Sequence, residues 1–191
     1  MFRAVLGILG ASLLLSCSEP PDPTTPKGAF AMVAKCIDGA DRQCFFRQLE
    51  RDSRWSIYTI HRTLAEMRGL VDKSYPEELR ASAYGVWSME AAAPTPEAMF
   101  EIFCKQRKCL ESVAKGYGAV AKVIPKGADE VTVETVRGGK YDMARAGGKW
   151  GLDLYREELD KEKIRLLDRL KQVRINAKQY DEQRLAQDGD K

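Results

Sequence analysis

The residues of this sequence best equipped for chemistry are its five cysteines. The first, Cys17, ends a short apolar stretch and is a candidate for lipid acylation. The other four fall into two close pairs, which are Cys36 with Cys44 and Cys104 with Cys109. Paired cysteines form either cystines or metal sites, and the choice depends on the compartment that the chain reaches.

The segment before Cys17 has the layout of a secretory signal. Arg3 precedes an apolar run over residues 4–15, which is too short for a transmembrane helix of about 20 residues. The phrase Leu-Leu-Ser-Cys resembles the bacterial lipobox, which implies removal of residues 1–16 and acylation of Cys17. The residue after Cys17 is Ser18 and not an aspartate, which fits the sorting pattern of outer-membrane lipoproteins in a Gram-negative host. We therefore expect a lipid-anchored envelope protein at the outer membrane, facing the periplasm.

Export to an oxidising compartment favours cystines for the remaining four cysteines. Cys36 and Cys44 flank a predicted helix–turn–helix junction, so they are the first choice for a bridge. Cys104–Cys109 follows by elimination, and a cross-pairing between the two hairpins is the alternative. A metal site is disfavoured, because the sequence has no CxxC motif and His61 is its single histidine.

Glu134 is the main candidate for acid–base chemistry. A two-residue turn at Gly138-Gly139 would set Glu134 opposite Met143, on the apolar side of a hairpin. A desolvated carboxylate there would have a raised pKa and could serve as a general base. The competing interpretation, which we favour, is an ion pair with Arg145 at the diagonal position.

Other candidates have a simpler structural interpretation. His61 has no orienting carboxylate on its helix face and is expected to make a structural hydrogen bond. Trp55, Trp87, Tyr84 and Phe103 could line a ligand pocket, although aromatic residues on helices often belong to the core. The sequence contains no Gly-x-Ser-x-Gly, phosphate-loop or His-Glu-x-x-His motif. We therefore expect no catalytic set, cofactor or metal.

Composition excludes one class of partner. The 191 residues contain 31 Lys and Arg against 28 Asp and Glu, a nearly even balance. Nucleic-acid binding requires a concentrated excess of cations, so nucleic acid is not expected as a partner. Residues 17–191 are enough for one domain with a hydrophobic core.

The elements that must position these residues are helical in the first part of the chain. Residues 17–26 form a proline-rich linker. Capping and proline signals then predict helices that begin after Thr25, after Asp41, near Ser53, at Ser74-Tyr75-Pro76 and after Thr95. The fourth of these helices is expected to run to about Ala93.

The second part of the chain predicts a β-meander. Strands are expected over residues 120–124, 130–137, 140–145 and 150–154. The turn at Gly147-Gly148 would set Trp150 opposite Arg145 and Leu152 opposite Met143. The face that packs on the helices would collect Val136, Tyr141, Met143, Trp150, Leu152 and Leu154.

A long helix from residue 155 to about 186 closes the sequence. Apolar residues recur every seven positions along it and form a stripe, named the seven-residue stripe after this spacing, of Leu159, Leu166, Val173 and Tyr180. The d-type positions are Lys163, Leu170, Ala177 and Arg184. Such a stripe is weak for a free-standing coiled coil. We expect the first half to fold back on the domain and the second half to protrude, where it could dock an envelope protein.

This order of elements resembles the nuclear-transport-factor-2-like (cystatin-like) α+β cone, in particular uncharacterised envelope lipoproteins of δ-proteobacterial type. The phrases that carry the resemblance are residues 49–55, Ser74-Tyr75-Pro76, residues 133–141 and Gly148-Lys149-Trp150-Gly151-Leu152. The resemblance covers roughly residues 27–186 and implies helices packed on a curved antiparallel sheet. Enzymes of that superfamily line the cone with acids, tyrosines or histidines, and no such set can be matched here.

Together these observations predict an α+β protein with a signal peptide (1–16), a linker (17–26), a cone-like domain (27–154) and a terminal helix (155–191). The first function hypothesis is a non-catalytic binding or scaffolding module. The alternative is a small-molecule enzyme that uses Glu134 as base. A third hypothesis is a lipoprotein that holds a secreted toxin or an envelope protein by its terminal helix.

Overall fold

A computed structural model describes residues 20–189, so Cys17 and the predicted signal peptide lie outside the described residues. The elements are α1 (Pro26–Asp38), α2 (Arg42–Gln48), α3 (Arg51–Ser74), α4 (Glu77–Tyr84), the 3-10 turn η1 (Gly85–Trp87), α5 (Ser88–Ala91), α6 (Pro96–Gln106), α7 (Cys109–Gly116), β1 (Val120–Pro125), β2 (Glu130–Thr135), β3 (Lys140–Ala146), β4 (Lys149–Leu152) and α8 (Arg156–Gly189). The predicted α+β class is confirmed.

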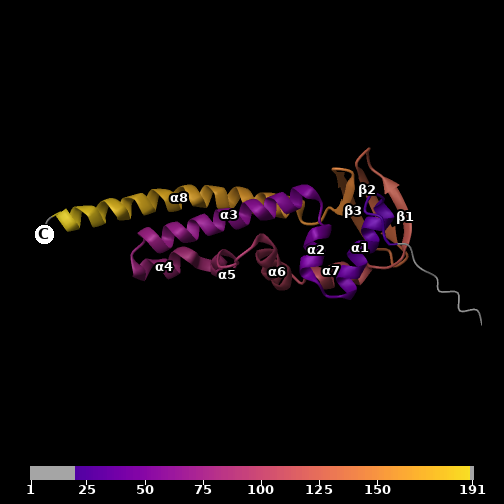
Figure 1. The fold of residues 1–191 in the computed structure, drawn as a ribbon, viewed down its shortest axis with the longest axis horizontal. Helices are drawn as coiled ribbons and strands as arrows, with labels where there is room; N and C mark the ends of the chain where they lie inside the picture. The colour runs from indigo at the N-terminus through magenta and orange to yellow at the C-terminus, as the bar shows by residue number, and fades with distance from the viewer. Residues whose placement is uncertain (1–19, 190–191) are drawn as a thin grey trace, which may run out of the picture.

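The elements separate into a body and an arm (Figure 1). In the body, α1, α2 and α7 lie beside a four-stranded antiparallel meander with the strand order β1-β2-β3-β4. The arm consists of α3 and α8, which run side by side away from the sheet, with α4 and α5 along its flank. The junction of body and arm therefore brings together segments that are far apart in the sequence.

The helix starts follow the local capping chemistry. The hydroxyls of Thr25 and Thr95 each accept a hydrogen bond from the amide three residues later, at 3.1 Å, and a proline follows each threonine. The predicted fourth helix, however, is divided into α4 and α5 by η1. Gly85 adopts a positive φ of 54° at the break, a conformation that glycine tolerates without a Cβ clash.

The second hairpin has the predicted register, with Arg145 opposite Trp150 and Met143 opposite Leu152. The first hairpin does not. Val133, rather than Val136, lies opposite Tyr141, and Glu134 lies opposite Lys140. The expectation that Val136 packs on the helices is wrong, since its side chain is 67% exposed.

The cause of the different register is a longer turn. β2 ends at Thr135, and the carbonyl of Gly139 accepts from the Thr135 amide at 2.9 Å, which leaves three residues between this pair instead of the two expected. The Thr135 hydroxyl also donates to the carbonyl of Gly116 at 2.6 Å. A Cβ on Gly116 would lie 2.9 Å from the Cα of Gly139, so the loop packs tightly on the end of α7.

The arm buries the predicted seven-residue stripe. The buried α8 residues are Leu159, Leu166, Leu170, Val173 and Ala177, and those of α3 include Ile57, Ile60, Leu64, Met67 and Val71. Lys163, a polar residue at a d-type position, donates to the Ser56 hydroxyl at 3.1 Å and pairs with Asp160 at 2.7 Å. The second half of α8 protrudes only beyond Tyr180, where it extends past α3 (Figure 1). The 24 residues of α3 give it a partner as far as Tyr180, whose ring centre lies 4.9 Å from that of Tyr75.

Cys36 and Cys44 form the predicted cystine between α1 and α2. A cystine indicates an extracytoplasmic compartment. Within residues 20–189, every helix is too short or too polar to cross a bilayer.

Candidate functional site

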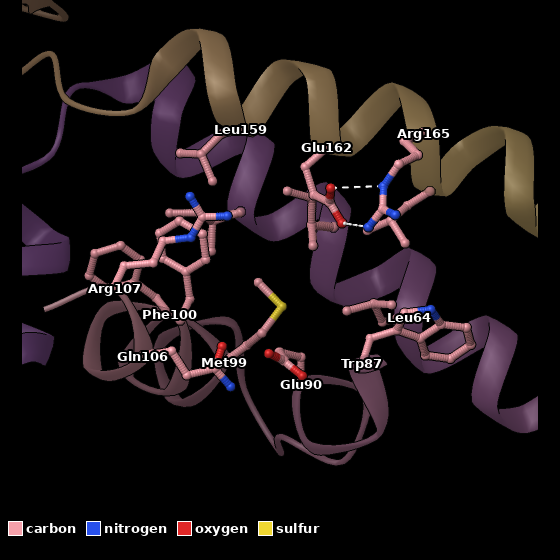
Figure 2. A pocket seen from close by; sticks show the side chains of 14 residues that line it. Leu64, Trp87, Glu90, Met99, Phe100, Gln106, Arg107, Leu159, Glu162 and Arg165 are labelled. Atoms are coloured by element: carbon pink, nitrogen blue, oxygen red, sulfur yellow. Dashed lines mark hydrogen bonds and ion pairs between the residues drawn. The ribbon is translucent and has the colours of Figure 1, made fainter. Parts of the chain in front are cut away.

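A cavity of about 250 Å³ lies at the junction of the arm and the body (Figure 2). Its apolar wall comes from three helices, with Ile57, Ile60 and Leu64 on α3, Met99 and Phe100 on α6, and Leu159 and Leu166 on α8. The break at Pro94 and the helix start at Thr95 turn α6 so that its apolar side faces the arm. The wall therefore consists of residues that were expected to form a continuous core.

Two residues that line this cavity each carry a buried polar atom without a hydrogen-bond partner among the described residues. These atoms are Nε1 of Trp87, a residue that is 4% exposed, and Oε2 of Glu90. In Figure 2 both side chains lie on the side of the cavity away from α8, and Glu90 lies below α3. A buried donor or acceptor without a partner costs about 1–3 kcal/mol, so these atoms favour a molecule that would pair with them.

The charges at the mouth of the cavity are paired. Arg165 donates to Glu162 at 2.6 Å, and both side chains come from α8, as Figure 2 shows. Arg107 pairs with Glu158 at 3.1 Å, and its guanidinium lies 4.5 Å from the ring centre of Phe103. These contacts fix the long side chains that frame the opening.

The predicted acid–base site is absent from this arrangement. Glu134 lies on the outer face of β2 and its carboxylate is 3.9 Å from Lys140, while Arg145 pairs with Asp129 at 2.7 Å. The expected Glu134–Arg145 pair is therefore wrong, and its cause is the altered register of the first hairpin. The structure offers no enclosed space around Glu134 among the described pockets.

The aromatic candidates are divided between sites. Trp87 and Phe103 line the cavity, whereas Trp55 is 64% exposed on the outer side of α3. Tyr84 donates to the carboxylate of Asp72. His61 makes a structural hydrogen bond, with Nε2 at 2.9 Å from a backbone carbonyl. Of the residues considered for a pocket, Trp55, Glu134 and Arg145 thus do not line the cavity that contains Trp87.

Cys104 and Cys109 are buried free thiols in this structure, unlike the bridge expected between them. The interaction with Cys109, together with burial, raises the pKa of the Cys104 thiol. Lys108 adopts a left-handed conformation (φ 52°), which turns the chain so that the two cysteines face each other. The same turn carries Gln106 and Arg107 to the mouth of the cavity.

Sequence reasoning missed most of the polar groups of the cavity. Glu162 and Arg165 have the spacing of a solvent-exposed helix pair, and Glu90 and Gln106 carry no motif. The available signal was the cluster of Trp87 and Phe103 in neighbouring helices.

Comparison with protein-family models, with curated proteins and with solved structures finds no match to this chain. The resemblance to the nuclear-transport-factor-2-like cone therefore stays a prediction. The functional argument depends on the geometry alone.

Proposed function

We propose that this chain is a bacterial envelope lipoprotein, tethered through Cys17, whose domain is a non-catalytic binding module for small molecules. The observation that supports binding is the cavity of about 250 Å³, which is lined by apolar residues and by Trp87 and Glu90, each with a buried polar atom that has no partner among the described residues. A mostly apolar pocket with a few placed polar groups is the usual make-up of a ligand site. The Cys36–Cys44 cystine supports the extracytoplasmic location.

The polar atoms define the ligand. Trp87 supplies an N–H donor, and Glu90 supplies a carboxylate acceptor. The lining contains two acids, Glu90 and Glu162, and two cations, Arg107 and Arg165, so its formal charges sum to zero, although Arg107 pairs with Glu158 outside the lining. The ligand is accordingly an uncharged amphipathic molecule with one hydrogen-bond acceptor, one donor and an apolar body.

Two fluorescent probes test these two contacts separately. Prodan is an uncharged naphthalene with a carbonyl acceptor and no N–H, whereas N-phenyl-1-naphthylamine has an N–H donor and no carbonyl. We expect both to bind with increased, blue-shifted emission. Trp87→Phe should weaken prodan about two- to tenfold, the usual value of a neutral hydrogen bond. Glu90→Met should weaken the naphthylamine by about tenfold or more, because that bond involves a charged group.

The control is Trp55→Phe, which changes an exposed tryptophan outside the cavity. The proposed pocket is contradicted if Trp87→Phe, Glu90→Met and Trp55→Phe all bind each probe with the same affinity. It is also contradicted if the unmodified chain shows no saturable binding of either probe. A pocket-filling variant, Leu64→Trp, should abolish binding of both probes.

The tether has an independent test. In cells, Cys17→Ser should prevent labelling by a fatty-acid analogue and release the protein from the envelope fraction. Unchanged processing and sedimentation would show that the anchor is wrong, without affecting the probe experiment.

Two other hypotheses have less support. Catalysis by Glu134 would require an enclosed site, and the side chain lies on the outer face of the sheet beside Lys140. Docking of an envelope protein on α8 stays a prediction. Because α3 covers the seven-residue stripe, such a partner would meet the opposite side, where Ile164 and Ile175 are 59% and 52% exposed.

A further inference from the structure

We propose that a second cavity, where the sheet meets the start of α3, binds the phosphate group of an anionic ligand. Its volume is about 350 Å³, and it is separate from the cavity described above. Four cationic side chains line it, and they are Arg47, Arg51, Arg54 and Lys149. One acid, Glu50, lies among them, so the lining has a clear excess of positive charge.

The acid does not neutralise this excess, because it is already engaged. Glu50 is 3% exposed and caps α3, where its carboxylate accepts from the amides of Asp52, at 2.6 Å, and Ser53. The Glu50 carboxylate also forms an ion pair with Arg156, at 3.6 Å. The carboxylate therefore serves the helix start and the arm rather than the cationic wall.

Three of the four cations lack a partner in the part of the chain that the structure describes. Arg47, Arg54 and Lys149 make no ion pair there, and only Arg51 meets an acid, Asp52, at 3.4 Å. Nε of Arg54 is buried and has no hydrogen-bond partner among those residues. Guanidinium groups bind phosphate through parallel N–H donors, and a buried unpartnered donor favours such an anion.

The position of the cavity suggests the source of the phosphate. Pro23 lies in its wall, and the Pro23 carbonyl accepts from the amide of Trp150 at 3.0 Å. Residues 17–22 span at most about 20 Å when extended. If Cys17 is acylated, as proposed above, the cationic wall is held within that distance of a bilayer, where phospholipid headgroups supply phosphate. A soluble phosphate ester presents the same chemistry.

The test uses the mature chain, residues 17–191, with Cys17→Ser so that no acyl group is added. One arm measures co-sedimentation with vesicles of phosphatidylcholine and phosphatidylglycerol in a three-to-one ratio, against phosphatidylcholine alone. The other arm titrates inorganic phosphate by calorimetry. The cavity variant is Arg47→Gln/Arg54→Gln, and Arg47→Gln/Lys149→Gln is a second variant whose altered side chains are both exposed.

The matched control is Lys161→Gln/Lys178→Gln, which removes the same charge from exposed positions on α8. Each cation near an anionic surface contributes about fivefold, so the cavity variants should partition roughly thirtyfold less onto the anionic vesicles. Binding in either arm that the cavity variants lose and the control keeps supports the site, and the arm that responds identifies the phosphate source.

Two results would overturn the proposal. One is an equal loss of binding in the control, which would mean that only net charge matters. The other is the absence of binding to both the anionic vesicles and inorganic phosphate. Neither result depends on acylation of Cys17, so the tether and this site can fail separately.

Discussion

Replacement of Gly151 by alanine is expected to disturb the joint between the sheet and the arm. Gly151 lies in β4 directly against the backbone that leads into α3, and an added Cβ would be 2.6 Å from the Cα of Glu50 and 2.7 Å from its nitrogen. The neighbouring Leu152 carbonyl accepts from the Glu50 amide at 2.9 Å. Because the crowded atoms are backbone, no side-chain rotation can relieve the clash.

The expected cost follows from these contacts. Relief requires the strand and the helix start to separate by most of an ångström, and overpacking of this kind costs about 1–3 kcal/mol. Weakening of the Glu50–Leu152 hydrogen bond adds about 1 kcal/mol to this cost. Alanine also restricts the unfolded chain more than glycine does, which offsets roughly half a kcal/mol of the loss. The sum is a loss of about 1.5–3.5 kcal/mol, which for a chain of this size lowers Tm by roughly 3–14 °C.

Thermal unfolding followed by circular dichroism, with urea denaturation as a second measure, checks this value. The matched control is Gly127→Ala, since a Cβ at that position meets nothing within 4 Å. A Gly151→Ala variant that melts within a degree of the Gly127→Ala variant would refute the close approach of β4 and α3.

Three further predictions concern the arm, the second cysteine pair and one acid. Leu170→Ala should cost about 3 kcal/mol in urea unfolding because it opens a cavity between α3 and α8, whereas Leu167→Ala, at a 39% exposed position, should cost under about 1 kcal/mol. In an oxidising compartment, Cys104 and Cys109 should pass two electrons and two protons to a disulfide oxidant and form a cystine. Their tryptic peptides would then stay joined without reductant, although trypsin cuts between them, and two separately alkylated peptides would contradict this. Hydrogen bonds from Lys126 and Thr132 lower the pKa of Asp142, so its contribution is present above pH 3.8 and is lost as the pH falls through the lower folded value. Asp142→Asn should therefore lower Tm at pH 7, and the difference from the unmodified chain should shrink in acid.

Local chemistry determined the features that the sequence predicted correctly. Thr25 and Thr95 start helices because each hydroxyl satisfies an amide within its own first turn. The second hairpin has its predicted register because Gly147 and Gly148 adopt positive φ values of 58° and 77° in a two-residue turn. The seven-residue stripe of α8 likewise identified its buried side, since that pattern is a property of one helix.

Contacts between distant segments determined the features that the sequence did not predict. The first hairpin also contains a Gly-Gly pair, but Gly139 does not have a positive φ and only Gly138 does, at 79°. The Thr135 hydroxyl bonds to Gly116 and the Gly139 backbone packs there, which favours the longer turn. A shift of three residues in that register, which is an odd number, moved Glu134 from the inner to the outer face and removed the proposed catalytic base.

The cavity between the arm and the body shows why a binding site of this kind escapes a sequence reading. Its walls come from α3, α6 and α8, and each wall residue has a satisfactory interpretation on its own helix as core or as a surface pair. Only their assembly leaves Trp87 Nε1 and Glu90 Oε2 buried without partners. A core that evolved for stability alone would gain by replacing both groups with apolar ones of similar shape. The unpartnered donor and acceptor on residues that line this cavity are therefore the observation that supports the proposed ligand site.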